Sequence, residues 1–416
     1  MLQDVNTSRQ GARPREVPQE KETHKHLKRP ITPLFSLSNV VTFEGLVDQV
    51  LLCLSEQLDQ RFVATGETFD FGEWLQYFAF DVMGTMSFSR RYGFLEKGHD
   101  VGGMLDAIFA FMETAAPIYK NQVVHRLRKT PGMAILGVVT KAIRDRLSET
   151  VDAKNSRNVN PEKKDFLAHF LEIQKVHPDL QPWASTAWTF SNVIAGSDSV
   201  GTLIGTVMWQ SSEPGCCALQ DENFGERLII LRFTDNILQY PEQLEKLGEE
   251  LKAANISFPY PKWEEVRDLP YLDACVQEGA RIHPPFALPL ERIVPAGGVI
   301  VLGTSLPEGT LVGGNPNVVN RNEPIFGPRP EEWNPERWLC GGEGHKKKLE
   351  QSMLTFGAGR RVCLGKYIGI FEVKKLIPFL ILNYDIDIFD PKALTVENGF
   401  FVKQRGFLCT IKRRAL

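Results

Sequence analysis

The chain has 416 residues, of which 48 are Lys or Arg and 51 are Asp or Glu, so its formal net charge is −3. Hydrophobic residues make up 43% and charged residues 24% of the chain, which is an ordinary globular composition and excludes a disordered or collagen-like protein. A near-neutral charge also argues against a nucleic-acid-binding protein, which usually has a basic surface. The length allows one large domain or two to three ordinary ones.

The seven cysteines are odd in number, scattered, and lack the spacing of a zinc site. This pattern argues against a disulfide framework and favours a reducing compartment, and it allows one cysteine to be a cofactor ligand. The longest apolar runs are shorter than the roughly 20 residues that a membrane span needs, and no signal peptide is evident. We therefore expect a chain without a transmembrane anchor.

Hydrophobic periodicity predicts a mainly α protein with minor β-structure in the C-terminal half. Residues 1–22 are polar and charged, and we expect this N-terminal segment to be disordered. Apolar residues recur every three to four positions in the following stretches, which we predict to be helices: 70–83, 182–209, 268–283 and 364–382. Residues 286–314 are rich in Val, Ile, Gly and Pro, which predicts short strands and turns.

Residues 210–236 interrupt this pattern, because they show no sustained period although helical periodicity resumes at Ile237. A long structureless loop inside a compact domain is unusual. We interpret the segment as an insertion or an error in the gene model; the alternative is a genuine solvent-exposed loop.

A glycine-rich loop followed by a lone cysteine and a predicted helix is the strongest chemical signal. Gly357 and Gly359 allow the backbone to approach a flat ligand, and Gly365 keeps the first helical turn thin. The helix N-terminus would stabilise a thiolate at Cys363, and Arg361 could pair with a carboxylate of the ligand. These features fit a haem iron held by a cysteine thiolate.

This loop resembles the haem-binding signature F-G-x-G-x-R-x-C-x-G of cytochrome P450 enzymes. All six fixed positions match, namely Phe356, Gly357, Gly359, Arg361, Cys363 and Gly365. The resemblance implies the cytochrome P450 fold, with one large helical haem domain over 23–416 and small β-sheets in its C-terminal half. It also implies haem b as the cofactor, with Cys363 as the axial iron ligand. The amino-acid sequence of neighbouring stretches is most similar to that of fungal pisatin-demethylase-like members.

Glu278 and Arg281 stand three residues apart on a predicted helix and share one of its faces. Such pairs on a surface are common and contribute little stability. In the family, however, E-x-x-R pairs with the Arg of a P-E-R-W segment, which is present here at 335–338. The resemblance therefore assigns a structural role to Glu278, Arg281 and Arg337.

The polar patch at 195–199 lies in the middle of an apolar predicted helix. Without context a helix kink would explain it, but it resembles the oxygen-activation motif of the family. The resemblance makes Ala195 and Gly196 line the substrate side and gives Asp198 and Ser199 a catalytic role in proton delivery. Val200 replaces the usual second hydroxyl residue, so proton delivery is less certain here and uncoupled turnover is expected.

The resemblance also suggests residues with weaker signals. Arg29 and Arg292 would bind haem propionates, although a solvated basic run and a surface arginine are the competing interpretations. Four apolar residues would line the substrate side, although core packing competes for the last two: Phe286, Leu288, Phe400 and Phe401.

Taken together, the sequence predicts a monooxygenase that inserts one oxygen atom from O₂ into an apolar small molecule, in secondary metabolism or detoxification. NADPH would supply electrons through an NADPH–cytochrome P450 reductase. The family expectation is the cytosolic face of the endoplasmic reticulum membrane, although this chain shows no anchor and its N-terminus is shorter than that of microsomal members. Two alternatives are a truncated relative without productive haem binding, and a relative that rearranges an oxygenated substrate without O₂; the second is weakened by Asp198 and its neighbouring hydroxyl.

Overall fold

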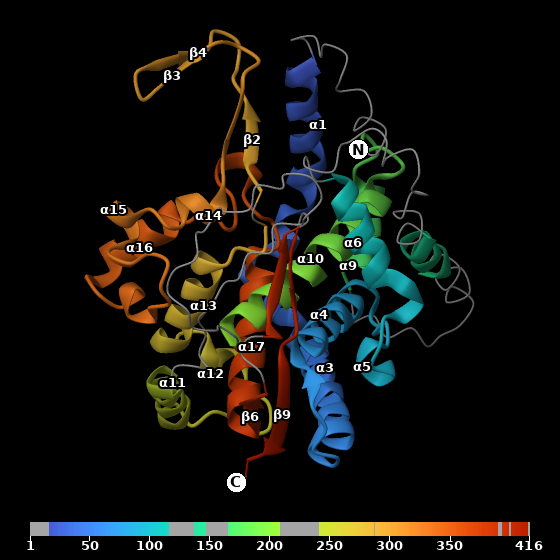
Figure 1. Cartoon of the computed structure of the whole chain (residues 1–416). Coiled ribbons are helices and arrows are strands. Elements are labelled where there is room, and N and C mark those ends of the chain that lie inside the picture. The colour runs from blue at the N-terminus through green and yellow to red at the C-terminus, as the bar shows by residue number, and fades with distance from the viewer. Residues whose placement is uncertain are drawn as a thin grey trace, which may run out of the picture.

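The computed structural model describes residues 16–115, 137–146, 165–208, 241–286, 288–389, 393–398 and 401–414. Figure 1 shows a mainly helical body from which one arm with small antiparallel strand pairs projects. The predicted mainly α architecture with small sheets is therefore confirmed. Of the segment predicted to be disordered, residues 1–15 lie outside the described residues, and a helix begins at Glu16, before the predicted boundary. The predicted insertion at 210–236 also lies outside the described residues.

The N-terminal half is helical. Its longer helices are α1 (Glu16–Ile31), α3 (Glu44–Leu58), α4 (Phe71–Phe88), α6 (Met104–Ala115), α9 (Phe166–Val176) and α10 (Ala184–Met208). Short helices lie between them, including α2 (Leu37–Val40) and α5 (Phe94–Lys97). Asp70 begins α4 as predicted, because its carboxylate accepts a hydrogen bond of 2.9 Å from the Gly72 N–H.

The C-terminal half contains helices and all but one of the described strands. Its helices are α11 (Pro241–Ala253), α12 (Trp263–Val266), α13 (Pro270–Ile282), α14 (Pro316–Val319), α15 (Glu323–Phe326), α16 (Gly342–Ser352) and α17 (Lys366–Asn383). The strands are β1 (Phe69–Asp70), β2 (Leu290–Ile293), β3 (Val299–Val301), β4 (Thr304–Leu306), β5 (Leu311–Gly314), β6 (Tyr384–Ile388), β7 (Thr395–Asn398), β8 (Val402–Arg405) and β9 (Leu408–Arg413).

All described strand pairs are antiparallel. The largest sheet has the order β1-β9-β6, so the C-terminal strand joins the beginning of α4 to the end of α17. Three hairpin-like pairs complete the β-structure: β2 with β5, β3 with β4, and β7 with β8. The first two account for the strands predicted over 286–314.

Helix α10 crosses the middle of the molecule and packs against α4, α9, α13 and α17 (Figure 1). Its crossing with α13 requires a glycine, because a Cβ at Gly279 would stand 2.6 Å from the Cγ2 atom of Val207. Its crossing with α17 places Val200 beside Gly369, where a Cβ would stand 3.4 Å from the valine methyl group. The start of α17, next to Cys363, is thereby held against the centre of α10.

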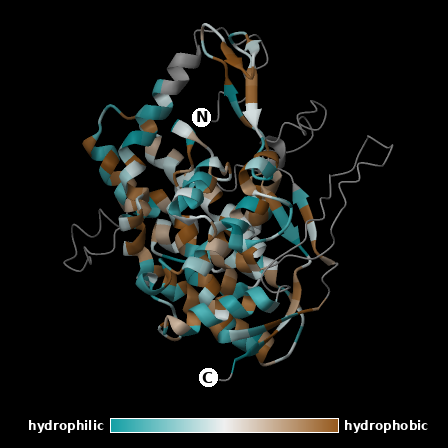
Figure 2. Cartoon of the chain, turned by 90° about the vertical axis from the view of Figure 1, so that its left-hand side faces the viewer, coloured by the Kyte–Doolittle hydropathy of each residue, from teal (hydrophilic) through white to brown (hydrophobic). Residues whose placement is uncertain are grey.

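Hydrophobic residues gather on the inner faces of the helices, as Figure 2 shows, and form one large core. Within the described residues, the helical run Leu37–Val63 is long and apolar enough to cross a membrane by length and composition. Its residues Val47, Leu51 and Leu54 are fully buried against other helices. We therefore assign this run to the core of the fold.

Helix α17 carries a carboxyl group in this core. The Glu372 side chain is fully buried, and neither of its oxygens has a hydrogen-bond partner within the described part of the chain. Burial raises the pKa of Glu372 well above its usual range. The folded state therefore holds the proton more tightly than the unfolded state does, and the stability that this provides is lost as pH rises above the unfolded pKa.

We expect Glu372→Gln to reduce the pH dependence of stability and Glu372→Leu to stabilise the protein by about 1–3 kcal/mol near neutral pH, because a buried polar group without a partner is removed. Urea denaturation at about pH 5 and about pH 8 measures both effects. The exposed Glu343 provides the matched control variant, Glu343→Gln. A wild-type free energy of unfolding that does not fall between the two pH values would contradict the expectation.

Candidate active site

The loop from Phe356 to Gly365 turns back on itself before α17 begins. The Cys363 N–H donates to the Phe356 carbonyl at 2.7 Å, and the Gly357 N–H donates to the Leu354 carbonyl at 2.8 Å. Gly357 and Gly359 have φ angles of 70° and 63°, which lie in the left-handed region that favours glycine. The two glycines of the predicted motif therefore permit the tight turn that presents Cys363.

The Cys363 thiol lies at the end of this turn, with one open side and protein atoms around the others. Cys363 is exposed, and burial of its enclosed sides raises the pKa of the thiol. The N–H groups of Gly365 and Lys366 and the positive charges of Lys28 and Lys366 oppose this increase. Two amide donors and two ammonium groups are thus arranged to stabilise a negatively charged sulfur.

The surroundings of Cys363 fit a flat ligand such as haem. A Cβ placed on Gly359 or on Gly365 would meet no described atom within 4 Å beyond its chain neighbours, so open space borders the loop. No group of three or more metal-ligating side chains occurs in the described segments. A single thiolate beside an open face is the donor set that a haem iron takes from a protein on one side.

Two residues of α1 face this loop. The Lys28 ammonium donates to the Val362 carbonyl at 2.9 Å and to the Arg360 carbonyl at 3.2 Å. Burial, together with the charges of Arg361 and Lys28, lowers the pKa of His24. Arg29, the predicted propionate ligand on this helix, is exposed. The spacing of His24 and Lys28, four residues apart on one helix face, is the sequence signal that could have identified Lys28.

The other predicted propionate ligands are exposed as well. Arg361 is exposed and its charge acts on His24 and Lys28 of α1, and Arg292 lies on β2, where its guanidinium donates to the Glu291 carbonyl at 2.8 Å. Strand β2 lies near the loop, since a Cβ on Gly357 would stand 3.8 Å from the Leu290 side chain. The structure therefore brings β2 to the loop, while the role of Arg292 stays a prediction.

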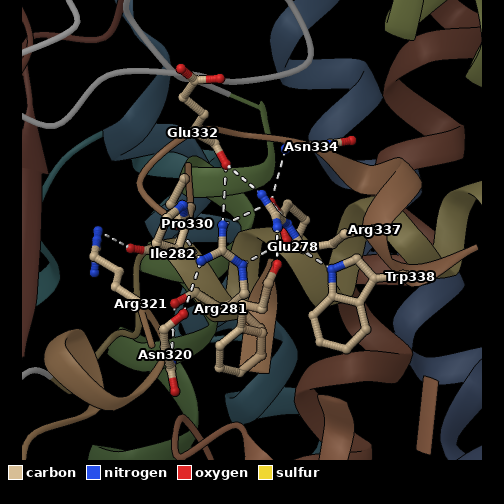
Figure 3. Close-up of polar contacts among 12 residues, drawn as sticks. Glu278, Arg281, Ile282, Asn320, Arg321, Pro330, Glu332, Asn334, Arg337 and Trp338 are labelled. Atoms are coloured by element: carbon tan, nitrogen blue, oxygen red, sulfur yellow. Dashed lines mark hydrogen bonds and ion pairs between the residues drawn. The ribbon is translucent and has the colours of Figure 1, made fainter. Parts of the chain in front are cut away.

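The predicted Glu278–Arg281–Arg337 set forms one buried network, shown in Figure 3. The Glu278 carboxylate accepts two hydrogen bonds of 2.8 Å from Arg281 and one of 2.9 Å from Arg337. The Trp338 indole N–H and the Asn334 N–H also donate to it at 2.8 Å. The two guanidinium groups hold the pKa of Glu278 below its usual range despite complete burial.

The guanidinium groups also bind the irregular segment that follows α14. Arg281 donates to the carbonyls of Asn320 and Glu332 at 2.9 Å and 3.2 Å. Asn320, which sequence reasoning did not identify, connects this network to the cysteine loop. Its side-chain amide donates to the Thr355 hydroxyl at 2.8 Å, and its side-chain oxygen Oδ1 accepts from the Leu354 N–H at 2.8 Å. Both residues directly precede Phe356, so the network positions the beginning of the cysteine loop.

On α10, the two predicted catalytic residues point in different directions. Ser199 is partly exposed and donates to the Ala195 carbonyl at 2.6 Å, and Ala195 is exposed. Asp198 is buried, accepts a short hydrogen bond from the Gln76 amide of α4, and has a pKa raised by burial, partly offset by Lys403 and Gln76. The structure thus gives α10 an exposed hydroxyl face and a buried carboxyl face.

Gly196 lies where α10 faces α4. A Cβ at this position would stand 2.9 Å from the Met83 side chain, so the glycine allows α4 to approach α10. The place of Gly196 on the substrate side stays a prediction, and the described arrangement shows only that the Cβ direction of this glycine faces Met83 of α4.

Three of the four predicted substrate-lining aromatic and aliphatic residues outside α10 are described. Phe286 and Phe401 face each other across an isolated antiparallel bridge, with ring centroids 6.5 Å apart at an angle of 74°. Leu288 is buried, and in the sequence it lies between Phe286 and β2. Phe400 lies outside the described residues. The structure therefore brings together two segments, 283–290 and 401–405, that are far apart in sequence.

Comparisons with known proteins give a consistent result. The sequence profile described as Cytochrome P450 matches residues 6–209 and 234–411. The unmatched residues 210–233 fall inside the predicted insertion. A cytochrome P450 monooxygenase named mfmA from Annulohypoxylon moriforme is 53% identical over 95% of this chain and 75% of its own length. A cytochrome P450 monooxygenase named pkfB from Emericella nidulans is 46% identical over 95% of this chain and 74% of its own length.

The crystal structure of the cytochrome P450DA haem domain superimposes with a TM-score of 0.73. The superposition covers 93% of this chain and 76% of the haem-domain chain at 15% sequence identity, so the likeness supports the fold alone. The overall fold that carries the cysteine loop, the Glu278 network and the central α10 thus has a solved counterpart.

We expect Glu278→Ala to destabilise the protein by about 3–5 kcal/mol, because it leaves two buried guanidinium groups without their carboxylate. Chemical denaturation monitored by circular dichroism measures the change. The exposed pair Arg329–Glu332 has the same three-residue spacing, so Glu332→Gln is the matched control and should change stability by less than about 1 kcal/mol. Equal effects of the two variants would mean that the buried network does not stabilise the fold as described.

Proposed function

The chain belongs to the cytochrome P450 family, and we propose that it is a haem-thiolate monooxygenase that inserts one oxygen atom from O₂ into an apolar small molecule. The family and fold imply haem with a cysteine thiolate ligand and electrons supplied by a reductase. The bound haem supplies O₂ binding and cleavage of the O–O bond, which thiolate ligation favours. The observation that carries the proposal is the open-sided Cys363 thiol between a glycine turn and the beginning of α17.

Cys363 is the proposed iron ligand. The N–H groups of Gly365 and Lys366 and the ammonium of Lys28 stabilise its thiolate form, since each lies close enough to favour the negative charge. Arg361 is proposed to bind a haem propionate, and Arg29 and Arg292 remain candidates for the same role. Cys363 would bind the iron as a thiolate, and the two N–H groups and the Lys28 ammonium would stabilise that form against the pKa increase caused by burial.

Asp198 and Ser199 are proposed to deliver protons to the oxygen-binding side. Ser199 presents its hydroxyl on the exposed face of α10. Asp198 lies one residue, or about 100°, around the helix, where the Gln76 amide holds its carboxyl group. A carboxyl whose pKa is raised by burial is closer to neutral pH and is better suited to exchange protons there.

The substrate is proposed to be apolar, because the residues assigned to its side of the pocket are Phe286, Leu288 and Phe401. We place the reaction in secondary metabolism or detoxification, with an NADPH–cytochrome P450 reductase as the electron donor and the endoplasmic reticulum membrane as the location. The likeness to fungal cytochrome P450 monooxygenases supports this setting.

A reduced-CO difference spectrum tests the proposal directly. The haem-loaded protein, reduced and exposed to CO, should give the red-shifted Soret band of thiolate-ligated haem. Cys363→Ala should abolish this band because the thiolate is removed. Cys340 is the second exposed cysteine among the described residues, so Cys340→Ala is the matched control and should retain the band.

A soluble wild-type protein that takes up no haem would favour the alternative of a relative without productive haem binding. A Soret band that survives in Cys363→Ala would overturn the ligand assignment.

We expect Asp198→Asn to slow reductase-driven turnover by about 100-fold, because the amide keeps the shape but cannot transfer a proton. The reduced-CO spectrum should be unchanged. The measurement uses a substrate selected by the spectral shift that it causes on binding, and it follows product formation and H₂O₂ release across pH. The exposed Asp387→Asn is the control. Wild-type turnover in Asp198→Asn at every pH would exclude the carboxyl from proton delivery.

A further inference from the structure

The last two turns of α10 carry a buried polar group that the proposed chemistry does not use. Thr206 is 3% exposed, and three polar groups from three different parts of the chain contact its hydroxyl. It donates to the Thr202 carbonyl at 2.9 Å and lies 3.2 Å from the Nδ1 atom of His283. The side-chain amide of Gln404 donates to it at 2.8 Å.

These contacts satisfy the hydroxyl completely. A threonine hydroxyl has one proton and two lone pairs. The proton goes to Thr202, one lone pair accepts from Gln404, and the other accepts from His283 when the imidazole carries its proton on Nδ1. Burial and the nearby charge of Arg321 lower the pKa of His283 to about 3, so the imidazole is neutral at physiological pH. Each partner of Thr206 therefore has a defined donor or acceptor role.

The contact with Gln404 depends on a neighbouring glycine. A Cβ on Gly205 would overlap the Gln404 side-chain oxygen. Strand β8 also touches α10 one turn earlier, where the Thr202 hydroxyl donates to the Val402 carbonyl at 2.8 Å. The register of β8 along α10 therefore depends on the hydroxyl groups of Thr202 and Thr206 and on the absence of a side chain at Gly205.

The two segments that meet at Thr206 are those that carry the aromatic pair. His283 begins the segment that leads through Phe286 to β2, and Leu290 of β2 lies near Gly357 of the cysteine loop. Gln404 lies three residues after Phe401 on β8. Between them, the Val402 N–H donates to the Pro285 carbonyl at 2.9 Å. One hydroxyl thus anchors both segments on the same side of the Phe286–Phe401 contact.

We propose that Thr206 is a positioning residue for substrate selectivity: it holds segments 283–290 and 401–405 at a set separation and thereby sets the spacing of Phe286 and Phe401. This inference rests on the proposed function, because the aromatic pair is assigned to the substrate side of the haem. Without the hydroxyl, Gln404 and His283 lose their common partner, and only the Val402–Pro285 hydrogen bond and the Phe286–Phe401 bridge still fix the separation of the two segments. Large ligands, which reach the aromatic pair, are affected, whereas small ligands at the iron are not.

The chain offers matched variants for this test. Thr206→Val removes the hydroxyl at nearly constant volume, and Thr206→Ser retains it. Thr189 on the same helix is also buried, and its hydroxyl donates to the Ser185 carbonyl one turn earlier, at 2.7 Å. Thr189→Val is therefore the control for losing a buried threonine hydroxyl from α10. Gln404→Leu removes the hydrogen bond that anchors segment 401–405 to Thr206, and it serves as a second variant if Thr206→Val does not fold.

The first measurement is hydrogen–deuterium exchange of the full-length haem-loaded protein. Thr206→Val should increase exchange in peptides that cover 283–286 and 401–405, and Gln404→Leu should do so in 401–405 alone. Thr206→Ser and Thr189→Val should match the wild type in these peptides. Unchanged exchange in both Thr206→Val and Gln404→Leu would overturn the proposal.

The second measurement compares two probes that bind haem iron through an imidazole nitrogen, followed by their spectral shifts. Imidazole is small, whereas clotrimazole carries three phenyl rings. Thr206→Val should weaken clotrimazole binding relative to imidazole binding by about fivefold, equivalent to about 1 kcal/mol, and Thr206→Ser should restore the wild-type ratio. An unchanged ratio, or the same change in Thr189→Val, would overturn the proposal. A wild-type protein without the reduced-CO Soret band would instead defeat the proposed function, while the exchange experiment would still report on the anchoring.

Discussion

The buried carboxylate of Glu278 faces two guanidinium groups, and the positions of several distant segments depend on this interaction. Burying three charges is costly unless each donor and acceptor is satisfied. Here the carboxylate accepts from Arg281, Arg337, Trp338 and the Asn334 backbone. The remaining guanidinium N–H groups bind carbonyls of a segment that has little regular secondary structure. The guanidinium donors and the backbone carbonyls of this irregular segment therefore satisfy each other's hydrogen-bonding groups.

This network reaches the cysteine through a short chain of contacts. Arg281 binds the backbone of Asn320, whose side chain binds Leu354 and Thr355. The glycine turn then follows immediately and presents Cys363 at the beginning of α17. A network on α13 thus positions a sulfur atom that lies more than 80 residues later in the sequence. The position of the proposed ligand therefore depends on the glycine turn and on side chains that bind the loop from Asn320 and Lys28.

Helix α10 serves several purposes because its faces meet different partners. Ser199 lies on its exposed face, Asp198 is held by Gln76 of α4, and Thr206 contacts both β8 and the residue that follows α13. Glycines at 196, 205 and, on α13, 279 allow these partners to approach closely. The helix therefore connects the proposed proton-delivery residues with the segments proposed to determine selectivity, and all of them share one rigid element.

The sequence by itself determined the features that depend on local pattern. Periodicity predicted the helices at 70–83 and 182–209, and the spacing of residues in the 356–365 loop predicted a glycine turn before a helix and suggested haem. Features that depend on contacts between distant segments were decided only by the tertiary structure. Lys28 rather than Arg29 faces the cysteine loop because of how α1 is rotated against it. Asp198 is buried with an amide partner because Gln76, 122 residues earlier, lies against its face of α10. A helical pattern states which residues share a face, but the neighbour of that face is set by packing across the whole chain.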